Sequence, residues 1–201
     1  DLGAPKLNIS KMMDNKNRIV TDLTKGIEFL FKKNKITSFI GNGYISSPTE
    51  VTVSSKNDTT IVKTGKILIA TGSEAAPLNN ISIDEKKIVS STGALELTTV
   101  PKKFIVVGGG YIGLELASAI RELDIEVCIL ELEDRILKRV TTAEVSDFYH
   151  QYHANHGVDI RCSTGLEEIV SENGALSKLK LSDGTELKTD ALIVGIGAIP
   201  N

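Results

Sequence analysis

The strongest constraint on the fold is an apolar run that leads directly into closely spaced glycines. Residues 104–107 form a strand-like run, and Gly108, Gly110 and Gly113 follow with the spacing Gly-x-Gly-x-x-Gly. Beyond them, apolar residues recur at helical spacing, at Ile112, Leu116, Ala119, Ile120 and Leu123. The sequence therefore predicts a strand, a tight turn and a helix in immediate succession.

Each glycine of this motif has its own task when the turn binds a dinucleotide. Gly108 permits the tight turn, Gly110 lets the backbone approach a pyrophosphate, and Gly113 lets the helix pack closely on the strand. The start of the helix adds free N–H groups and the positive end of the helix dipole, which both attract phosphate. A strand–turn–helix without phosphate is the alternative interpretation, and the context on both sides of the glycines favours dinucleotide binding.

A carboxylate at the end of the next strand indicates which dinucleotide is bound. Glu131 stands 18 residues beyond the last glycine, where an acidic residue accepts hydrogen bonds from the adenosine ribose. Together with Glu133 it would repel a 2′-phosphate, so the pattern favours NAD over NADP. Arg135, Lys138 and Arg139 follow closely, and they leave a basic NADP site as the alternative.

Composition excludes several other classes of protein. The chain has 201 residues, of which 41% are hydrophobic and 24% charged, as is usual for a globular protein. A net charge of −3 without a basic run argues against nucleic-acid binding. No apolar stretch approaches the ~20 residues that span a bilayer, so we expect no membrane partner. The chain lacks an initiator Met and a signal peptide, and we expect both of its ends to be internal to a longer polypeptide.

Cysteines and histidines do not predict a metal site. Cys128 and Cys162 lie in separate strand-like runs, and we expect both to be reduced and buried or nearly buried. His150, His153 and His156 follow each other at intervals of three, and we expect them on a solvated helix face. We therefore expect no metal.

The first half predicts a helix, a small antiparallel sheet and then a buried strand. Apolar spacing predicts a helix over 15–34, and short β-rich runs separated by turn residues predict strands. These runs are 38–40, 44–46, 51–54 and 60–62. The unbroken apolar run 66–73 predicts a buried strand of a parallel sheet, and a short helix is expected over 92–97.

The second half continues the strand–glycine–helix unit. A helix over 141–156 that begins at Thr141 or Thr142 and a third parallel strand over 158–161 are expected. An antiparallel meander should follow over 167–170, 176–181 and 185–187, with turns at 173–174 and 183–184. A buried strand over 191–197 completes the unit. The predicted fold class is α/β: a Rossmann-like fold whose parallel sheet carries helices and an antiparallel β-meander crossover.

These segments together resemble the pyridine nucleotide-disulfide oxidoreductases, and within them the dihydrolipoamide dehydrogenases. The resemblance is carried by these runs: 23–26 (LTKG), 41–45 (GNGYI), 67–73 (ILIATGS), 91–95 (STGAL), 107–115 (VGGGYIGLE) and 194–201 (VGIGAIPN). The stretch 148–158 is more similar to flavin-dependent ferredoxin reductases. The resemblance implies a Rossmann-like FAD/NAD(P)-binding fold, with part of an FAD-binding domain at 1–95 and an NAD-binding domain at 96–201, within a flavoprotein that has two dinucleotide domains.

The resemblance also implies two sets of cofactor-binding residues. The NAD set is Gly108, Gly109, Gly110, Tyr111, Ile112, Gly113, Glu115, Glu131, Val170 and Gly197. The FAD set is Gly43, Ala70, Thr71 and Gly72. A bulky ring at Tyr111 would shield the flavin until nicotinamide displaces it. No catalytic residue is expected within this chain, because the family's Cys-x-x-x-x-Cys pair should lie before residue 1 and its His-Glu pair beyond residue 201.

The expected function is the transfer of hydride between NAD(H) and flavin within an FAD-dependent oxidoreductase. The expected enzyme acts on lipoamide as its partner. The alternatives are an NADH-dependent ferredoxin reductase, whose partner is ferredoxin, and an isolated non-catalytic nucleotide-binding module. We expect the full-length protein to be a homodimer in the cytoplasm, or in the mitochondrial matrix of a eukaryote. This chain alone is expected to be inactive.

Overall fold

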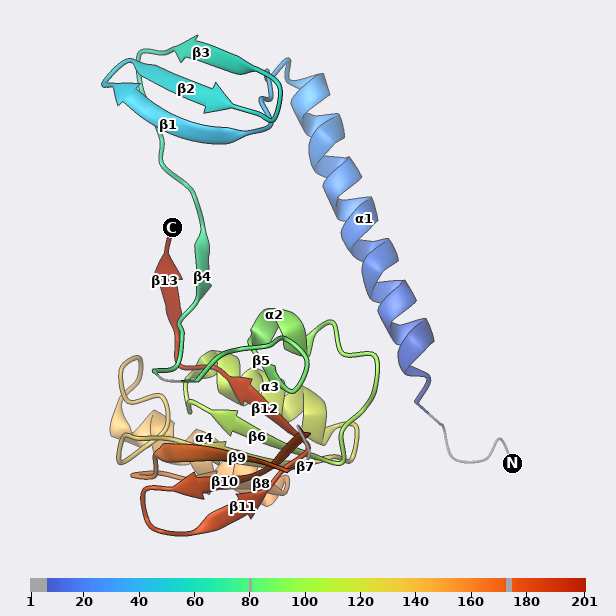
Figure 1. The fold of residues 1–201 in the computed structure, drawn as a ribbon, viewed down its shortest axis with the longest axis vertical. Helices are drawn as coiled ribbons and strands as arrows, with labels where there is room; N and C mark the ends of the chain where they lie inside the picture. Colours follow the sequence, from blue (N-terminus) through green and yellow to red (C-terminus); the bar gives the residue numbers. More distant parts are fainter. Residues whose placement is uncertain (1–6, 80, 173–174) are drawn as a thin grey trace. The chain divides into compact units, whose positions relative to one another are not determined.

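The computed structural model describes residues 7–79, 81–172 and 175–201, which belong to two units (Figure 1). The N-terminal unit is Lys11–Gly72, and the C-terminal unit contains Ser73–Asn201 and residues 7–10. The division falls before the 95/96 boundary that the sequence suggests between cofactor domains, because the strand at Ile88–Val89 pairs within the C-terminal unit. The assignment of the two cofactors to these stretches stays a prediction.

The N-terminal unit consists of a long helix and an antiparallel three-stranded sheet. Its elements are α1 (Ile9–Lys33) from Lys11 onward, β1 (Asn42–Ser47), β2 (Glu50–Ser54) and β3 (Thr59–Lys63), with the strands in the order β1-β2-β3. They confirm the expected helix and three of the four expected short strands. Residues 38–40 form no strand.

The predicted buried strand over 66–73 is wrong. Residues 66–72 are irregular, and Leu68 and Ile69 are 91% and 67% exposed. Only β4 (Ser73–Ala75) is extended, and it pairs antiparallel with β13 (Ala198–Pro200). Within the described part of the chain no strand pairs with 66–72, and an apolar run becomes a buried strand only where neighbouring strands and covering layers exist.

The C-terminal unit is built on a five-stranded parallel sheet, which confirms the α/β class. Its strands are β5 (Ile88–Val89), β12 (Ala191–Val194), β6 (Lys103–Val107), β7 (Glu126–Leu130) and β8 (Val158–Arg161), in that spatial order. In the register, Val106 is opposite both Ile129 of β7 and Ile193 of β12. Strands β6, β7, β8 and β12 were predicted, whereas the two-residue β5 was not.

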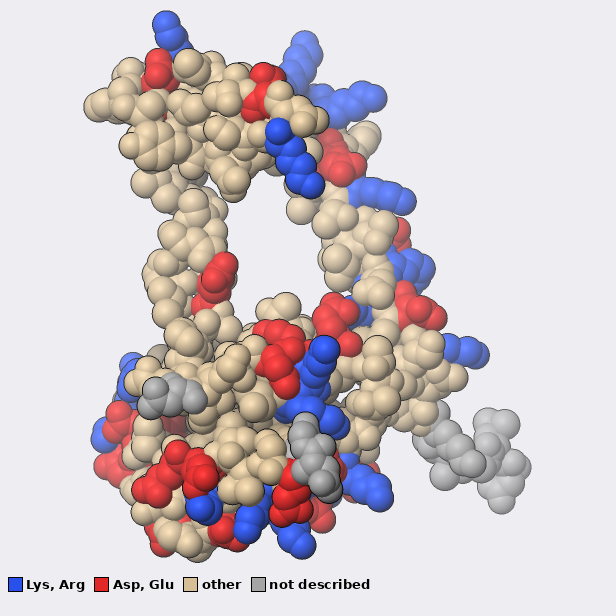
Figure 2. Space-filling model, in the orientation of Figure 1, with Lys and Arg blue, Asp and Glu red and all other residues tan. Residues whose placement is uncertain are grey.

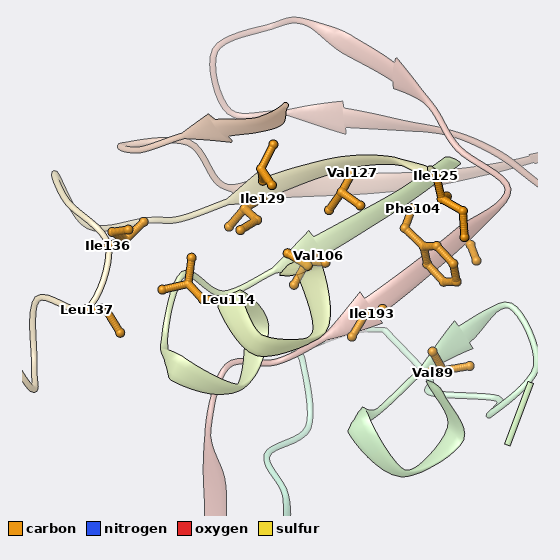
Figure 3. Packing of buried hydrophobic residues seen from close by; sticks show 13 residues of the cluster. Val89, Phe104, Val106, Leu114, Ile125, Val127, Ile129, Ile136, Leu137 and Ile193 are labelled. Carbon is orange, nitrogen blue, oxygen red and sulfur yellow. The ribbon is translucent and has the colours of Figure 1, made fainter. Parts of the chain in front are cut away.

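One face of this sheet packs against helix α3 (Tyr111–Arg121). Leu114 and Ala117 of α3 are buried in one cluster with Val106 and Ile129 (Figure 3). The loop after β7 adds Ile136, which is fully buried. Alternate residues of the strands therefore hold the helix that follows the glycine turn in a fixed position.

The other face packs against the predicted antiparallel meander. Its strands are β9 (Leu166–Glu172), β10 (Ala175–Leu181) and β11 (Glu186–Lys188). Leu179 and Leu181 of β10 are buried with Ile105 and Leu130 of the sheet. Because both faces are covered, the strands are apolar without alternation. The turn predicted at 173–174 lies outside the described residues, and the predicted turn at 183–184 places Gly184 at φ +80°.

The two remaining helices are shorter than predicted. Helix α2 covers only Ser91–Ala94, where the Ser90 side chain accepts a hydrogen bond from the Thr92 N–H. Helix α4 covers Ala143–Asn155 and begins after Thr142, one of the two expected caps, although its hydroxyl makes no capping bond.

The expected solvated histidine face is wrong at one position. His153 is only 7% exposed on α4, which packs against β8, and burial lowers its pKa with a further contribution from the charge of His156. His150 is half-buried and His156 exposed. Among the residues that the structure describes, no group of His, Cys, Asp and Glu is arranged to hold a metal ion.

The charged surface carries both signs. Figure 2 shows Lys and Arg intermingled with Asp and Glu over the visible face of the C-terminal unit. Across the described ranges, no helix is both long enough and apolar enough to span a membrane.

Both cysteines are free, and burial makes one of them a source of alkaline instability. Cys128 is 2% exposed on β7, and burial raises the pKa of its thiol from 9.0 to about 12, with a smaller effect from Asp159. The folded protein thus binds this proton more tightly than the unfolded chain. Its stabilising contribution is complete below pH 9 and is lost as the pH rises toward 12.

We therefore expect the wild type to lose about 1.4 kcal/mol more unfolding free energy than Cys128→Ala between pH 8 and pH 10. Urea denaturation of both proteins at the two pH values measures this difference. Comparing the change with pH within each protein removes the constant cost of the cavity left by alanine. Equal losses in the two proteins would contradict the role of the buried thiol.

Candidate functional site

The glycine turn begins directly after β6, where the backbone leaves no room for a side chain. Gly108 has φ +113°, and its N–H donates a 2.8 Å hydrogen bond to the Leu130 carbonyl. A Cβ atom there would collide with the carbonyl group of Gly195, whose carbon would be 2.8 Å away. The turn can approach the end of β12 this closely only because residue 108 is glycine.

The other two motif glycines shape the start of α3. A Cβ on Gly113 would collide with the Gly108 carbonyl oxygen, so this glycine lets the helix lie tightly on the turn. Gly110 is the N-cap residue, and nothing lies within 4 Å of the position of its missing Cβ. As the first helical residues, Tyr111 and Ile112 have N–H groups without an acceptor inside the helix. These N–H groups can donate to a bound anion.

Glu131 connects the glycine turn to the loop that follows β7. Its Oε2 accepts a hydrogen bond from the Gly109 N–H at 2.6 Å, and its Oε1 accepts one from the Glu133 N–H at 2.9 Å. A carboxylate has about four acceptor positions, so both oxygens can still accept hydroxyl groups. The sequence predicted contact with a sugar for Glu131, but gave no sign that it also fixes the turn.

A pocket of about 550 Å³ opens beside these elements in the C-terminal unit. It is lined by most of the residues expected for NAD, namely Gly108, Gly110, Tyr111, Ile112, Glu131 and Gly197. Gly109 and Gly113 shape the turn without lining the pocket. Glu115 is exposed on α3 and Val170 is half-buried on β9, and neither belongs to the lining.

Several lining residues were not predicted. Besides Glu133, Lys138 and Arg139, which were weighed in the choice between NAD and NADP, they are Pro77, Leu78, Asn79, Val107, Leu130, Leu132, Leu137, Val140, Thr164, Gly165, Leu166, Gly195 and Ile196. Most of them share one property: they stand at or follow the carboxyl end of a strand of the parallel sheet, where open α/β sheets bind ligands. If this rule had been applied to the sequence after β8 and β12, it would have predicted residues 164–166 and 195–196 as part of the pocket. No sequence signal points to residues 77–79.

Comparison with known proteins identifies the family. The model of the pyridine nucleotide-disulphide oxidoreductases matches residues 3–201. The chain belongs to this family. A leghemoglobin reductase of Vigna unguiculata is 41% identical over 99% of this chain and 39% of its own length, and a dihydrolipoamide dehydrogenase of Chaetomium thermophilum is 40% identical over 100% and 41%. The chain thus spans about two fifths of these curated relatives.

Solved structures agree with this family and fold. The crystal structure of a ferredoxin reductase from Rhodopseudomonas palustris is 28% identical and has a TM-score of 0.70, covering 87% of this chain and 44% of its own. The resemblance stated from the sequence and the Rossmann-like fold are both confirmed. FAD and NAD(H), the expected cofactors, are those of this family.

The residues of the C-terminal unit fit the dinucleotide of a pyridine nucleotide-disulphide oxidoreductase. The fit rests on the side-chain-free turn at Gly108, the open space at Gly110 and the carboxylate of Glu131 at the end of the adjacent strand. These groups all meet at one pocket. The pocket can therefore hold a diphosphate at the helix start and a sugar beside Glu131.

The residues expected for FAD lie in the N-terminal unit. Gly43 pairs with Val53 between β1 and β2, and Ala70, Thr71 and Gly72 are exposed. Gly72 has φ +76°, with nothing within 4 Å of the position of its missing Cβ. Their contact with FAD stays a prediction.

Two of the three basic residues that made an NADP site the alternative, Arg135 and Lys138, bind other groups of the protein. Arg135 donates hydrogen bonds to the carbonyls of Lys138, Thr141 and Thr142 at 3.2–3.3 Å, and so closes the loop after β7. Lys138 forms ion pairs with Glu133 at 2.9 Å and with Asp134 at 3.2 Å. The pocket rim therefore carries balanced charge.

Proposed function

We propose that the C-terminal unit binds NAD(H) and belongs to an FAD-dependent oxidoreductase of the dihydrolipoamide dehydrogenase type. The observation that carries this proposal is the meeting of the glycine turn, the start of α3 and the Glu131 carboxylate at one pocket. A single glycine motif is weak evidence, but here the fold and the pocket support it.

The pyrophosphate binds at the start of α3. The N–H groups of Tyr111 and Ile112 donate to its oxygens, and the helix dipole adds to the attraction. Gly110 allows this approach because it presents only backbone. Glu131 keeps the turn in shape through Gly109 and accepts the ribose hydroxyls with its remaining lone pairs.

The nicotinamide lies toward Tyr111 and Gly197. Tyr111 is 59% exposed at the pocket, so its ring is free to change rotamer. Gly197 has φ +128°, and its carbonyl accepts a hydrogen bond from the Ala76 N–H at 2.9 Å, which holds the backbone of this wall. When bound, NAD(H) and FAD supply the hydride chemistry, and the protein supplies position and shielding.

For the whole protein we propose lipoamide as the disulfide partner, an FAD site that includes Gly43 and 70–72, and a homodimer in the cytoplasm or the mitochondrial matrix. The names of the curated relatives support lipoamide. An NADH-dependent ferredoxin reductase is the second candidate, supported by the structural likeness to a ferredoxin reductase. The chain alone, with two fifths of the length of its relatives, should not turn over either partner.

Titration of the 201-residue chain with NADH and NADPH by calorimetry tests the nucleotide site. We expect NADH to bind more tightly than NADPH, and Glu131→Ala to weaken NADH binding by about 1–3 kcal/mol, the cost of losing a hydrogen bond to a charged group. Glu186→Ala is the control, since it removes an exposed carboxylate that pairs with Lys178 away from the pocket. No heat with either nucleotide would overturn the proposal, and an unchanged affinity in Glu131→Ala would remove this residue from the site.

A further inference from the structure

Helix α4 exposes its large apolar side chains. They recur at the spacing i, i+3, i+4 and i+7, which places them on one side of the helix. They are 40–62% exposed, whereas the two buried residues of the helix are polar, Ser146 and His153. The exposed residues, here called the α4 stripe, are Val145, Phe148, Tyr149 and Tyr152.

The rings of the α4 stripe contact one another and form a continuous row. Phe148 stacks on Tyr152 with ring centroids 6.3 Å apart, and it meets Tyr149 edge-on at 5.4 Å. Tyr152 extends the row to His156, whose ring centroid is 4.3 Å away. Aromatic side chains supply large contact areas at a low cost in conformational entropy, because they have only two torsions. A partner would therefore meet a surface whose rings already support each other.

We propose that the α4 stripe binds the α4 stripe of a second copy of this chain, with the two helices antiparallel. Such a pair has two-fold symmetry, and the same surface serves both copies. Antiparallel helices bring dipole ends of opposite sign together, which adds an attraction. None of the stripe residues lines the nucleotide pocket, so this contact is independent of the proposed binding of NAD(H).

The two ends of α4 favour a reversed copy of the same helix as the occupant. The first turn carries the acidic Glu144, the C-cap is His156, and no Lys or Arg stands between them. An antiparallel pair can set Phe148 against Tyr152 of the second copy. Glu144 then comes opposite His156 of the second copy, because each stands four residues further along. By symmetry, the acidic end of each helix meets the histidine end of the other.

The His156 ring can bind a carboxylate in this arrangement. Its Nδ1 lies 2.7 Å from the Tyr152 carbonyl oxygen, which can only accept, so Nδ1 donates there. In the protonated ring Nε2 also donates, and the Glu144 carboxylate of the second copy can accept. Hydrogen bonds from its own N–H and from the Thr142 hydroxyl lower the pKa of the Glu144 carboxyl, which favours its charged form.

The size of the α4 stripe indicates how strong the contact can be. Aromatic side chains cover about 150–250 Å² each when buried, so the exposed parts of the stripe amount to about 400 Å² in each copy. Two copies would then bury about 800 Å², less than the roughly 1,200 Å² at which stable interfaces begin. We therefore expect a weak and reversible dimer, with a Kd on the order of 100 μM.

Sedimentation equilibrium of the 201-residue chain tests this contact. From about 10 μM to about 1 mM, the mean mass should rise from that of the monomer toward that of the dimer. Phe148→Ser/Tyr152→Ser should raise the Kd about tenfold or more, because it removes two stripe rings. Leu23→Ser/Phe29→Ser is the matched control, since it removes two side chains of α1 that are 65% and 64% exposed.

The control should leave the Kd within about twofold of the wild type. Circular dichroism verifies the fold of both double variants, in which only exposed side chains change. A wild-type chain that stays monomeric would mean that another partner covers the α4 stripe, and would overturn the inference. Association that persists in Phe148→Ser/Tyr152→Ser, or that falls equally in the α1 control, would overturn it as well.

Two charge variants test the antiparallel arrangement. His156→Lys places a permanent cation opposite Glu144 and should lower the Kd about threefold, as expected for two exposed ion pairs. Glu144→Lys/His156→Lys places like charges opposite each other, so its Kd should exceed that of the wild type. An unchanged Kd in both variants would overturn the antiparallel pairing. These results are read without nucleotide, so they leave the titrations with NADH as a separate test of the proposed function.

Discussion

Gly108→Ala is expected to lower the unfolding free energy of the C-terminal unit by about 4 kcal/mol. About 2 kcal/mol comes from forcing alanine into a left-handed backbone at φ +113°. About 2 kcal/mol more comes from the collision of its Cβ with the Gly195 carbonyl, since the backbone cannot yield without separating β6 from the end of β12. Urea denaturation followed by circular dichroism measures the loss.

Gly184→Ala separates the two causes in that experiment. Gly184 also has a left-handed backbone, with φ +80°, but nothing lies within 4 Å of the position of its missing Cβ. This control should lose only the backbone part, about 2 kcal/mol. Equal losses at the two positions would mean that the close approach to Gly195 costs nothing, and would contradict our account of the turn.

Gly110→Val is expected to leave the fold intact and to weaken NADH binding on the order of 100-fold, or about 2.7 kcal/mol. Gly110 has φ −78° and ψ 179°, which valine adopts readily, and open space surrounds its Cβ position. The new side chain would stand where the pyrophosphate must approach the start of α3. Calorimetry with NADH measures the affinity, and thermal denaturation verifies the fold.

Gly65→Val is the matched control for this prediction. It makes the same chemical change at a position with open space in the N-terminal unit. Its NADH affinity should equal that of the wild type. If Gly110→Val bound NADH as tightly as this control, the diphosphate could not lie at the start of α3.

The sequence predicted most of the C-terminal unit because each element there carries its own signal. The run 104–107 is apolar, the glycines that follow have a fixed spacing, and both were found as β6 and the turn before α3. Turn residues likewise marked the meander, whose strands appear within a few residues of the expected limits. Local preferences and tertiary packing agree in this unit, so the sequence alone suffices.

Prediction failed where the outcome depends on distant partners. The run 66–73 has the composition of a buried strand, but without neighbours it is irregular and exposed. His153 was expected in water and is buried, because the packing of α4 against β8 decides its environment. At the site, the motif predicted the glycines and Glu131, whereas the ion pairs of Lys138 depend on how the loop after β7 folds back.

The pairing of β4 with β13 has an engineering consequence. These short antiparallel strands are the first and last of Ser73–Asn201, so the chain enters and leaves this stretch side by side. A segment whose two ends lie close together can be inserted into a surface loop of an unrelated protein without distorting the backbone of that loop. Because β4 and β13 are adjacent, the segment that they bound is suited to insertion, as a unit, into a loop of another protein.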